Sequence, residues 1–114
     1  MSLSNEQWLF LQDVSSLITY AKDKGYKLTG GELYRTKEQQ DIYVKEGKSK
    51  TYNSNHLKRL AIDFNLFVDG DIIWSKSDEW IELGNYWESL NDENKWGGNY
   101  NSFTDLPHFE RIVK

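Results

Sequence analysis

No cysteine occurs among the 114 residues of the chain. Disulfide bonds and thiolate metal ligands are therefore excluded, and any zinc site would have to be built from histidine and carboxylate side chains. The chain has only two histidines, His56 and His108. A zinc site with nitrogen ligands would have to use both of them.

Proline, repeats and low-complexity tracts are equally scarce. Pro107 is the single proline, and no long serine- or glycine-rich stretch occurs, whereas aromatic residues make up 15% of the chain and are spread along it. This composition argues against disorder, repeats and linkers. A chain of this length can bury about two thirds of the surface that it exposes when unfolded. We therefore expect one domain over residues 1–114.

The sequence also has no excess of positive charge. Its 18 acidic and 14 basic residues give a formal net charge of −4, whereas a nucleic-acid binder normally has a dominant basic surface. One local basic cluster exists, and we interpret it as solvated surface beside a loop. The cluster consists of Lys45, Lys48, Lys50, Lys58 and Arg59. No nucleic-acid partner is expected.

Long apolar runs are absent as well, so no membrane insertion is expected. Residues 1–17 lack the basic start, the apolar centre and the small-residue cleavage site of a secretory signal. We expect synthesis in the cytoplasm without a signal peptide. Nothing in the sequence marks an oligomer interface, and a monomer is expected.

Capping residues and apolar periodicity predict three helices. Ser4, with a glutamine three residues later, predicts the start of a first helix that ends at Gly25. Thr36 predicts the start of a second helix, which Gly47 ends. Ser77 predicts the start of a third helix, whose apolar face is expected to pack against a sheet.

Short apolar segments predict the strands. Two of them flank Asp69 and Gly70, which predicts a β-hairpin with its first strand at Leu60–Val68. Another strand within residues 26–34 is interrupted by two consecutive glycines, which indicates a bulge or a close backbone approach. The last strand is expected at His108–Val113. These elements predict an α+β fold, with a small antiparallel sheet and helices packed on one side.

The segment from Ser54 to Asp63 changes from a polar loop to an apolar strand and carries two candidate metal ligands. His56 lies in the loop. Asp63 puts a charge inside the strand, where it needs a cation, a metal or several hydrogen bonds. The distant motif Asp105-x-x-His108 would complete a set of two histidines and one carboxylate. Catalytic zinc takes three protein ligands and leaves a fourth position for water.

A hydrolytic site of this kind also needs a base and a fixed positive charge. Asp105 is the candidate base, and Arg35, expected at the end of a strand, is the candidate cation for the oxyanion. The spacing alone leaves a second interpretation open. In it the histidines are incidental, Asp63 pairs with a lysine or arginine, and the chain is an interaction domain without metal.

The chain contains three short motifs, which are Ser54-x-His56, Ala61-x-Asp63 and Asp105-x-x-His108. They resemble the motifs of zinc peptidases that cut peptidoglycan stem peptides. These are D-Ala-D-Ala carboxypeptidases and dipeptidases, and phage-type L-alanyl-D-glutamate endopeptidases, whose fold is shared with the hedgehog signalling domain. The segments YRTKEQQDIYVKEGKSKT and WGGN also resemble this group, so the resemblance extends from Tyr34 to Glu110.

This resemblance implies a hedgehog/DD-peptidase-like fold and a zinc-dependent hydrolase of peptidoglycan stem peptides. The implied zinc ligands are His56, Asp63 and His108, with Asp105 as the general base. Arg35 would polarise the scissile carbonyl.

The resemblance also implies substrate contacts. Ser54 would contact the substrate backbone or steady the site, although a simple capping role for its hydroxyl stays open. Trp96 would form a wall of the substrate groove.

The chain departs from the family pattern at two positions. Arg59 stands where the family often has glycine, which puts the loop before the Asp63 strand in doubt but removes no ligand. Asp105 stands where carboxypeptidases and dipeptidases commonly have glutamate. The aspartate resembles the endopeptidase branch and favours cleavage between L-Ala and D-Glu.

Two alternatives stay open within this resemblance. The same zinc site could remove a terminal D-Ala as a carboxypeptidase, or the chain could be a zinc-stabilised binding module without catalysis. We expect a phage or prophage endolysin that acts on the cell wall after a holin releases it across the membrane.

Overall fold

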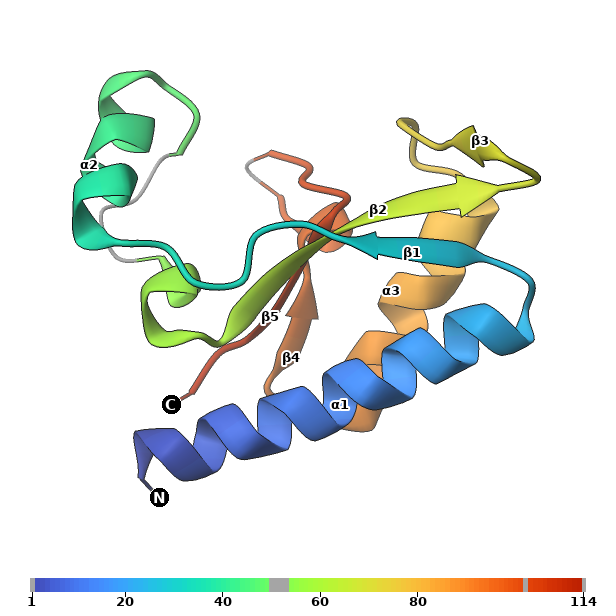
Figure 1. Ribbon diagram of the computed structural model, residues 1–114, viewed down its shortest axis with the longest axis horizontal. Coiled ribbons are helices and arrows are strands. Elements are labelled where there is room, and N and C mark those ends of the chain that lie inside the picture. Colours follow the sequence, from blue (N-terminus) through green and yellow to red (C-terminus); the bar gives the residue numbers. More distant parts are fainter. Residues whose placement is uncertain (1, 50–53, 102, 114) are drawn as a thin grey trace.

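The computed structural model describes residues 2–49, 54–101 and 103–113 (Figure 1). Three α-helices, two short 3-10 helices and five strands follow one another along the chain. In order they are α1 (Leu3–Asp23), β1 (Lys27–Gly30), α2 (Lys37–Lys45), η1 (Asn55–Lys58), β2 (Ala61–Val68), β3 (Asp71–Ile72), α3 (Asp78–Leu90), β4 (Asn94–Trp96), η2 (Gly97–Asn99) and β5 (His108–Arg111). None of the helices in these described ranges has the length and apolar character needed to cross a membrane.

The strands form one antiparallel sheet in the order β1-β2-β5-β4, and β3 pairs with β2 across the hairpin turn. Helices α1 and α3 pack against this sheet, whereas α2 stands apart from both beyond the end of the sheet (Figure 1). The expected α+β fold with a small antiparallel sheet is therefore confirmed. The expectation that helices pack on one side of the sheet is confirmed for α1 and α3.

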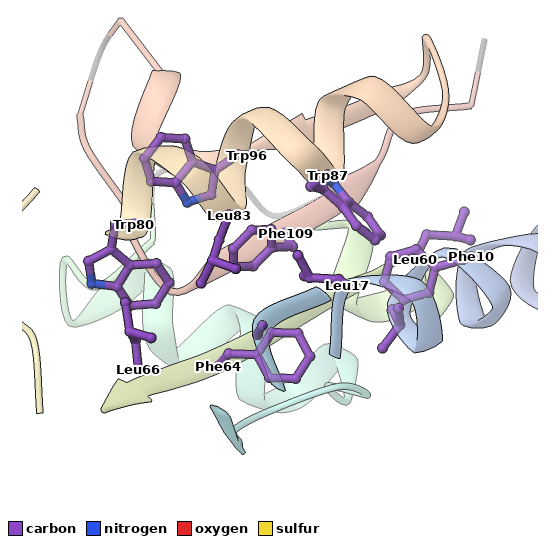
Figure 2. Close-up of a cluster of buried hydrophobic side chains, with 12 residues drawn as sticks. Phe10, Leu17, Leu60, Phe64, Leu66, Trp80, Leu83, Trp87, Trp96 and Phe109 are labelled. Atoms are coloured by element: carbon purple, nitrogen blue, oxygen red, sulfur yellow. The ribbon is translucent and has the colours of Figure 1, made fainter. Parts of the chain in front are cut away.

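One apolar cluster joins α1, α3 and the sheet (Figure 2). Phe109 of β5 lies near its centre, with its ring 5.9 Å from that of Trp87 and 6.4 Å from that of Trp96. The Trp96 side chain is 0% exposed, and its Nε1 donates a hydrogen bond of 2.8 Å to the carbonyl of Leu106. The expectation that Trp96 forms a wall of the substrate groove is wrong, because a fully buried ring offers no face to a substrate.

Two of the three predicted helix caps are confirmed. The Thr36 hydroxyl accepts a hydrogen bond from the backbone N–H of Gln39, and the Ser77 hydroxyl accepts one from Trp80. The prediction of the first cap is wrong. The hydroxyl of Ser2, and not that of Ser4, caps α1 by accepting a hydrogen bond from the backbone N–H of Asn5. Both serines have the same short hydroxyl side chain, so the local pattern does not distinguish them.

The hairpin is confirmed at the predicted residues. Asp69 and Gly70 have φ values of 53° and 86°, and positive φ at both central residues is the mark of a type I′ turn. Strand β2 begins one residue later than expected. Strand β5 ends at Arg111, and the expected extension to Val113 does not form. Residues 50–53 of the polar loop before η1, including Lys50 of the basic cluster, lie outside the described ranges.

The backbone at the end of β1 runs close to that of Asp63, as the two consecutive glycines Gly30 and Gly31 indicate. The N–H of Gly31 donates to the Asp63 carbonyl at 2.8 Å, and the Asp63 N–H donates to the Glu32 carbonyl at 2.9 Å. A Cβ atom on Gly31 would lie 2.9 Å from the Asp63 carbonyl oxygen, closer than van der Waals contact permits. These bonds fix the backbone of Asp63.

Candidate active site

His56, Asp63 and His108 come together on the sheet, although 45 residues separate the last two. One ligand atom from each lies within 4.8 Å of the others. Asp63 and His108 are directly paired across β2 and β5, which places their side chains on the same face of the sheet. His56 reaches the same point from η1. The structure thus brings together the three residues that the sequence indicated as candidate ligands.

A single carboxylate oxygen lies between the two imidazoles. Asp63 Oδ1 is 3.3 Å from His108 Nδ1 and 3.4 Å from His56 Nε2. The two rings have centroids 5.1 Å apart. All three ligand atoms thus face one small space.

The turn that carries His56 is fixed at both ends. The Ser54 hydroxyl accepts a hydrogen bond from the His56 N–H at 3.2 Å, which caps η1. Arg59 ends η1 in the left-handed region, with φ 56° and ψ 38°. His56 Nδ1 lies 2.9 Å from the Leu33 carbonyl oxygen, so Nδ1 carries the proton and Nε2 is left as the acceptor facing Asp63. Ser54 steadies the site in this way and also lines the cleft described below.

The donor set fits a metal ion. His56 Nε2 is fully buried and forms no hydrogen bond with any described residue, although Asp63 is near it. An unpaired buried nitrogen is unfavourable, and coordination of a cation would satisfy it. Two imidazoles and one carboxylate are ligands that zinc and similar transition metals accept.

Electrostatics at the cluster favour the ionised carboxylate. Burial alone would raise the pKa of Asp63, but the contacts with His108 and His56 outweigh it and hold the pKa well below its usual range. Burial also lowers the pKa of His56, and here the contact with Asp63 and its negative charge outweigh burial, so the pKa lies above the ordinary value. Asp63 therefore carries a negative charge here, which attracts cations.

Asp105 lies in the same cleft, in the loop before β5. Its N–H donates to the Gly97 carbonyl at 3.0 Å, and its carbonyl accepts from the His108 N–H at 3.2 Å. Gly97 is required at this contact, because a Cβ atom there would lie 2.2 Å from the Asp105 carbonyl oxygen. Burial raises the pKa of the Asp105 carboxyl, and the charge of Asp63 raises it further. A carboxylate with a raised pKa is a stronger base.

Arg35 also lines the cleft, and it is held firmly. Its guanidinium donates to the Glu32 carboxylate and, at 2.7 Å, to Gln40 Oε1, and it lies over the Tyr43 ring at 4.7 Å. The backbone N–H of Arg35 donates a hydrogen bond of 3.3 Å to the His56 carbonyl. The side chain is 11% exposed. A fixed positive charge therefore lies beside the candidate metal ligands.

These residues share one cleft of about 630 Å³. It contains His56, Asp63, His108, Asp105, Arg35 and Ser54. The cleft is also lined by Asn55 and Glu110, which the sequence did not indicate as site residues. Glu110 follows His108 by two positions in a strand, and this spacing, which puts both on one face, is the signal that could have found it.

Comparisons with known proteins agree with this geometry. Residues 47–111 match a peptidase M15 family model described as D-alanyl-D-alanine carboxypeptidase. The chain belongs to this family. It is therefore a peptidase, of a family whose members are generally metal-dependent.

Two relatives of this peptidase have L-alanyl-D-glutamate in their names. The chain is 35% identical to the peptidoglycan L-alanyl-D-glutamate endopeptidase CwlK of Bacillus subtilis, over 89% of this chain and 70% of the relative. It is 33% identical to the L-alanyl-D-glutamate peptidase of a Listeria phage, over 82% of this chain and 34% of the phage protein. The peptidase thus spans about a third of the phage relative.

A solved structure has the same fold. The crystal structure of the L-Ala D-Glu endopeptidase ChiX from Serratia marcescens superposes with a TM-score of 0.75 and covers 90% of this chain and 77% of its own. The sequences are 22% identical, so this match speaks for the fold alone.

Proposed function

We propose that this peptidase is a zinc-dependent endopeptidase that hydrolyses the L-alanyl-D-glutamate bond of peptidoglycan stem peptides. The observation that carries the proposal is the convergence of two histidines and one carboxylate in a cleft that also holds Asp105 and Arg35. The names of two relatives supply the bond. The substrate is a peptidoglycan stem peptide, and the chain acts as a monomer without nucleic acid or membrane insertion.

In this proposal His56, Asp63 and His108 hold the zinc ion. The orphaned Nε2 of His56 and the low pKa of Asp63 support this assignment, because ligands must be deprotonated to bind a metal. Zinc in such a site supplies Lewis-acid catalysis and makes water a stronger acid.

The other cleft residues act on the substrate and on protons. Asp105 accepts the proton of the attacking water and later delivers it to the leaving amine, and its raised pKa suits both steps. Arg35 stabilises the negative charge that develops on the scissile carbonyl oxygen, since Glu32 and Gln40 already hold its guanidinium in place. Ser54 orders η1 and lines the substrate side of the cleft.

The test uses purified peptidoglycan and Asp105→Asn. The wild-type protein loaded with zinc should produce new D-Glu amino termini, detected by mass spectrometry. Asp105→Asn should lower the rate by about a hundredfold or more while the metal content is unchanged. Asp71→Asn, on the exposed hairpin outside the cleft, is the matched control and should retain full activity. No new termini from several wall chemotypes would contradict the proposal.

A D-alanyl-D-alanine carboxypeptidase is the second candidate, because the matching family model carries that description. It would use the same metal ligands and the same base. Release of free D-alanine from intact stem peptides, with no internal cut, selects this activity. New D-Glu amino termini without free D-alanine select the endopeptidase.

The cell wall is the proposed site of action, in the manner of a phage or prophage endolysin. The phage relative supports this proposal. Expression of the protein in a bacterium should leave the culture intact, and coexpression with a pore-forming holin should lyse it. Lysis on expression of the protein alone would contradict release as the controlling step.

A further inference from the structure

Glu110 is a buried carboxylate that the proposed chemistry does not use. It is 9% exposed and lies on β5, two residues after His108. Successive residues of a strand point to opposite faces, so Glu110 shares the open face with His108, whereas Phe109 between them points into the core. A carboxylate in such a place needs partners.

Both partners of Glu110 belong to the metal cluster or adjoin it. One oxygen, Oε1, accepts a hydrogen bond of 2.5 Å from Nδ2 of Asn55. The other, Oε2, lies 3.4 Å from Nε2 of His108. Asn55 precedes the ligand His56 in η1. Glu110 thus connects the two segments that carry the histidines.

The His108 ring has a carboxylate at each nitrogen. Nδ1 faces Asp63 at 3.3 Å, on the side of the three ligand atoms, and Nε2 faces Glu110. A neutral imidazole has one donor and one acceptor nitrogen. Since the nitrogen that binds a metal must offer its lone pair, Nδ1 has to be the acceptor and Nε2 has to carry the proton. An acceptor at Nε2 favours this tautomer.

His56 is held in an equivalent way. Its Nδ1 faces the Leu33 carbonyl oxygen at 2.9 Å, which leaves Nε2 for the metal. Each histidine therefore uses one nitrogen toward the cluster and has an oxygen acceptor at the other. The two histidines differ in the acceptor, which is a backbone carbonyl for His56 and the Glu110 carboxylate for His108.

We propose that Glu110, held by Asn55, is a positioning residue that fixes the tautomer and ring orientation of His108 for metal binding. This inference rests on the proposed zinc site. Removal of an outer partner of this kind typically weakens metal binding by about tenfold to a hundredfold. Both oxygens of Glu110 already have partners, so its action passes through His108.

The first measurement is zinc affinity, by competition with a chromophoric chelator. Glu110→Ala should weaken zinc binding about tenfold to a hundredfold. Glu110→Gln, a variant of the same size, should weaken zinc binding less than Glu110→Ala does, because the amide keeps one acceptor oxygen. It should still bind zinc more weakly than the wild type, because the carboxylate offers two acceptor oxygens to its two donors. The d–d absorption bands of the cobalt-substituted protein should shift in both variants, since the orientation of a ligand changes.

Glu88 offers a matched control. It accepts hydrogen bonds from the Trp96 N–H at 2.9 Å and from Asn99 Nδ2 at 3.3 Å, and it lies outside the cleft. Glu88→Ala likewise removes a carboxylate that accepts from the side-chain amide of an asparagine. It should lower the melting temperature and leave zinc affinity within about twofold of the wild type, as expected for a site that does not contact the ligands.

The second measurement needs no metal. Long-range nitrogen-proton NMR spectra of the two histidines report which ring nitrogen carries the proton. In the metal-free wild type His108 has an acceptor at each nitrogen, whereas Glu110→Ala leaves only Asp63 at Nδ1, so the share of His108 that is protonated at Nε2 should fall in this variant. Equal tautomer populations, or equal zinc affinity of Glu110→Ala and the wild type, would overturn the inference alone. Failure of the wild type to bind zinc would instead overturn the proposed function.

Discussion

Asp63 and His108 face each other directly across the two central strands of the sheet, with 3.3 Å between Oδ1 and Nδ1. This pairing is a consequence of strand register. A shift of one residue would turn either side chain to the opposite face, where the apolar core lies. The register that buries Phe64 and Phe109 therefore also assembles the candidate metal site.

The first prediction concerns the shared carboxylate. Asp63→Asn keeps the size of the side chain but removes the charge that attracts the cation. We expect the zinc content to fall from about one ion per chain to a small fraction of that. The rise in melting temperature on zinc addition should disappear with it, because only a bound ligand stabilises the folded state. Metal analysis and thermal unfolding with and without zinc measure both effects.

Asn65 supplies the control for this experiment. It lies two residues further along the same face of β2 and is no part of the ligand set. Asn65→Ala should retain both the zinc content and the zinc-dependent rise in melting temperature. A full zinc content in Asp63→Asn would show that the metal is held elsewhere.

The second prediction concerns Arg59, which ends η1 in the left-handed region. Its φ of 56° is a conformation that costs a residue with a side chain about 1 to 2 kcal/mol. The guanidinium lies over the Tyr34 ring at 4.2 Å, a contact worth about 0.5 to 1 kcal/mol at an exposed site. The side chain thus offsets part of the backbone strain.

Two variants separate these opposing effects. Arg59→Ala keeps the strained backbone and loses the ring contact, so it should be destabilised by about 0.5 to 1 kcal/mol. Arg59→Gly loses the same contact and relieves the strain, so it should be more stable than the alanine variant. Urea denaturation measures the free energy of unfolding of each. An alanine variant as stable as the glycine variant would mean that the strain is negligible.

Features set by neighbouring residues could be predicted from the sequence. Thr36 and Ser77 cap their helices as expected, and Asp69 with Gly70 forms the expected turn. In each case the deciding interaction joins residues only a few positions apart. Ser4 was the exception, because a second serine two positions earlier offers the same hydroxyl to the helix start.

Features set by packing could not be predicted in the same way. The sequence indicated His56, Asp63 and His108 as one candidate set of metal ligands, but not that two of them are cross-strand neighbours. Trp96 was assigned to the groove through the family resemblance, yet Gly84 and Gly98 leave space for its ring in the core. Glu110 was not indicated by the sequence, because its role depends on a contact between β5 and η1, where Asn55 donates a hydrogen bond to it.

The third prediction follows from the packing of Trp96 against α3. An alanine in place of a helix-interior glycine is normally stabilising by about 1 kcal/mol. At Gly84 a Cβ atom would lie 2.1 Å from Trp96 Cε3, so the ring would have to move within a filled core. Gly84→Ala should therefore be destabilised by about 1 to 3 kcal/mol. Asn85→Ala, at the next and exposed position of the same helix, should be neutral or slightly stabilising.

A fourth prediction concerns the contact that two tyrosines, one in α1 and one just before β1, make with Glu82 of α3. Tyr26 donates a hydrogen bond of 2.6 Å to Glu82 Oε1, and Tyr20 donates one of 2.8 Å to Glu82 Oε2. Hydrogen bonding to Glu82, together with partial burial, raises the pKa of Tyr26 to about 12. The folded state thus retains the phenolic proton more strongly than the unfolded chain does.

The direction of the pH effect follows from this difference. Because the pKa of Tyr26 rises from 10.0 to about 12 on folding, its contribution to stability is complete below pH 10.0 and is lost as the pH rises toward about 12. Tyr26→Phe has no proton to lose and cannot donate to Glu82, so it should be less stable than the wild type at neutral pH and should lose less stability on alkalinisation. Chemical denaturation on both sides of the unfolded pKa measures the two slopes. Glu82→Gln should flatten the wild-type slope as well, whereas parallel curves for the wild type and Tyr26→Phe would show that this hydrogen bond does not control the alkaline loss of stability.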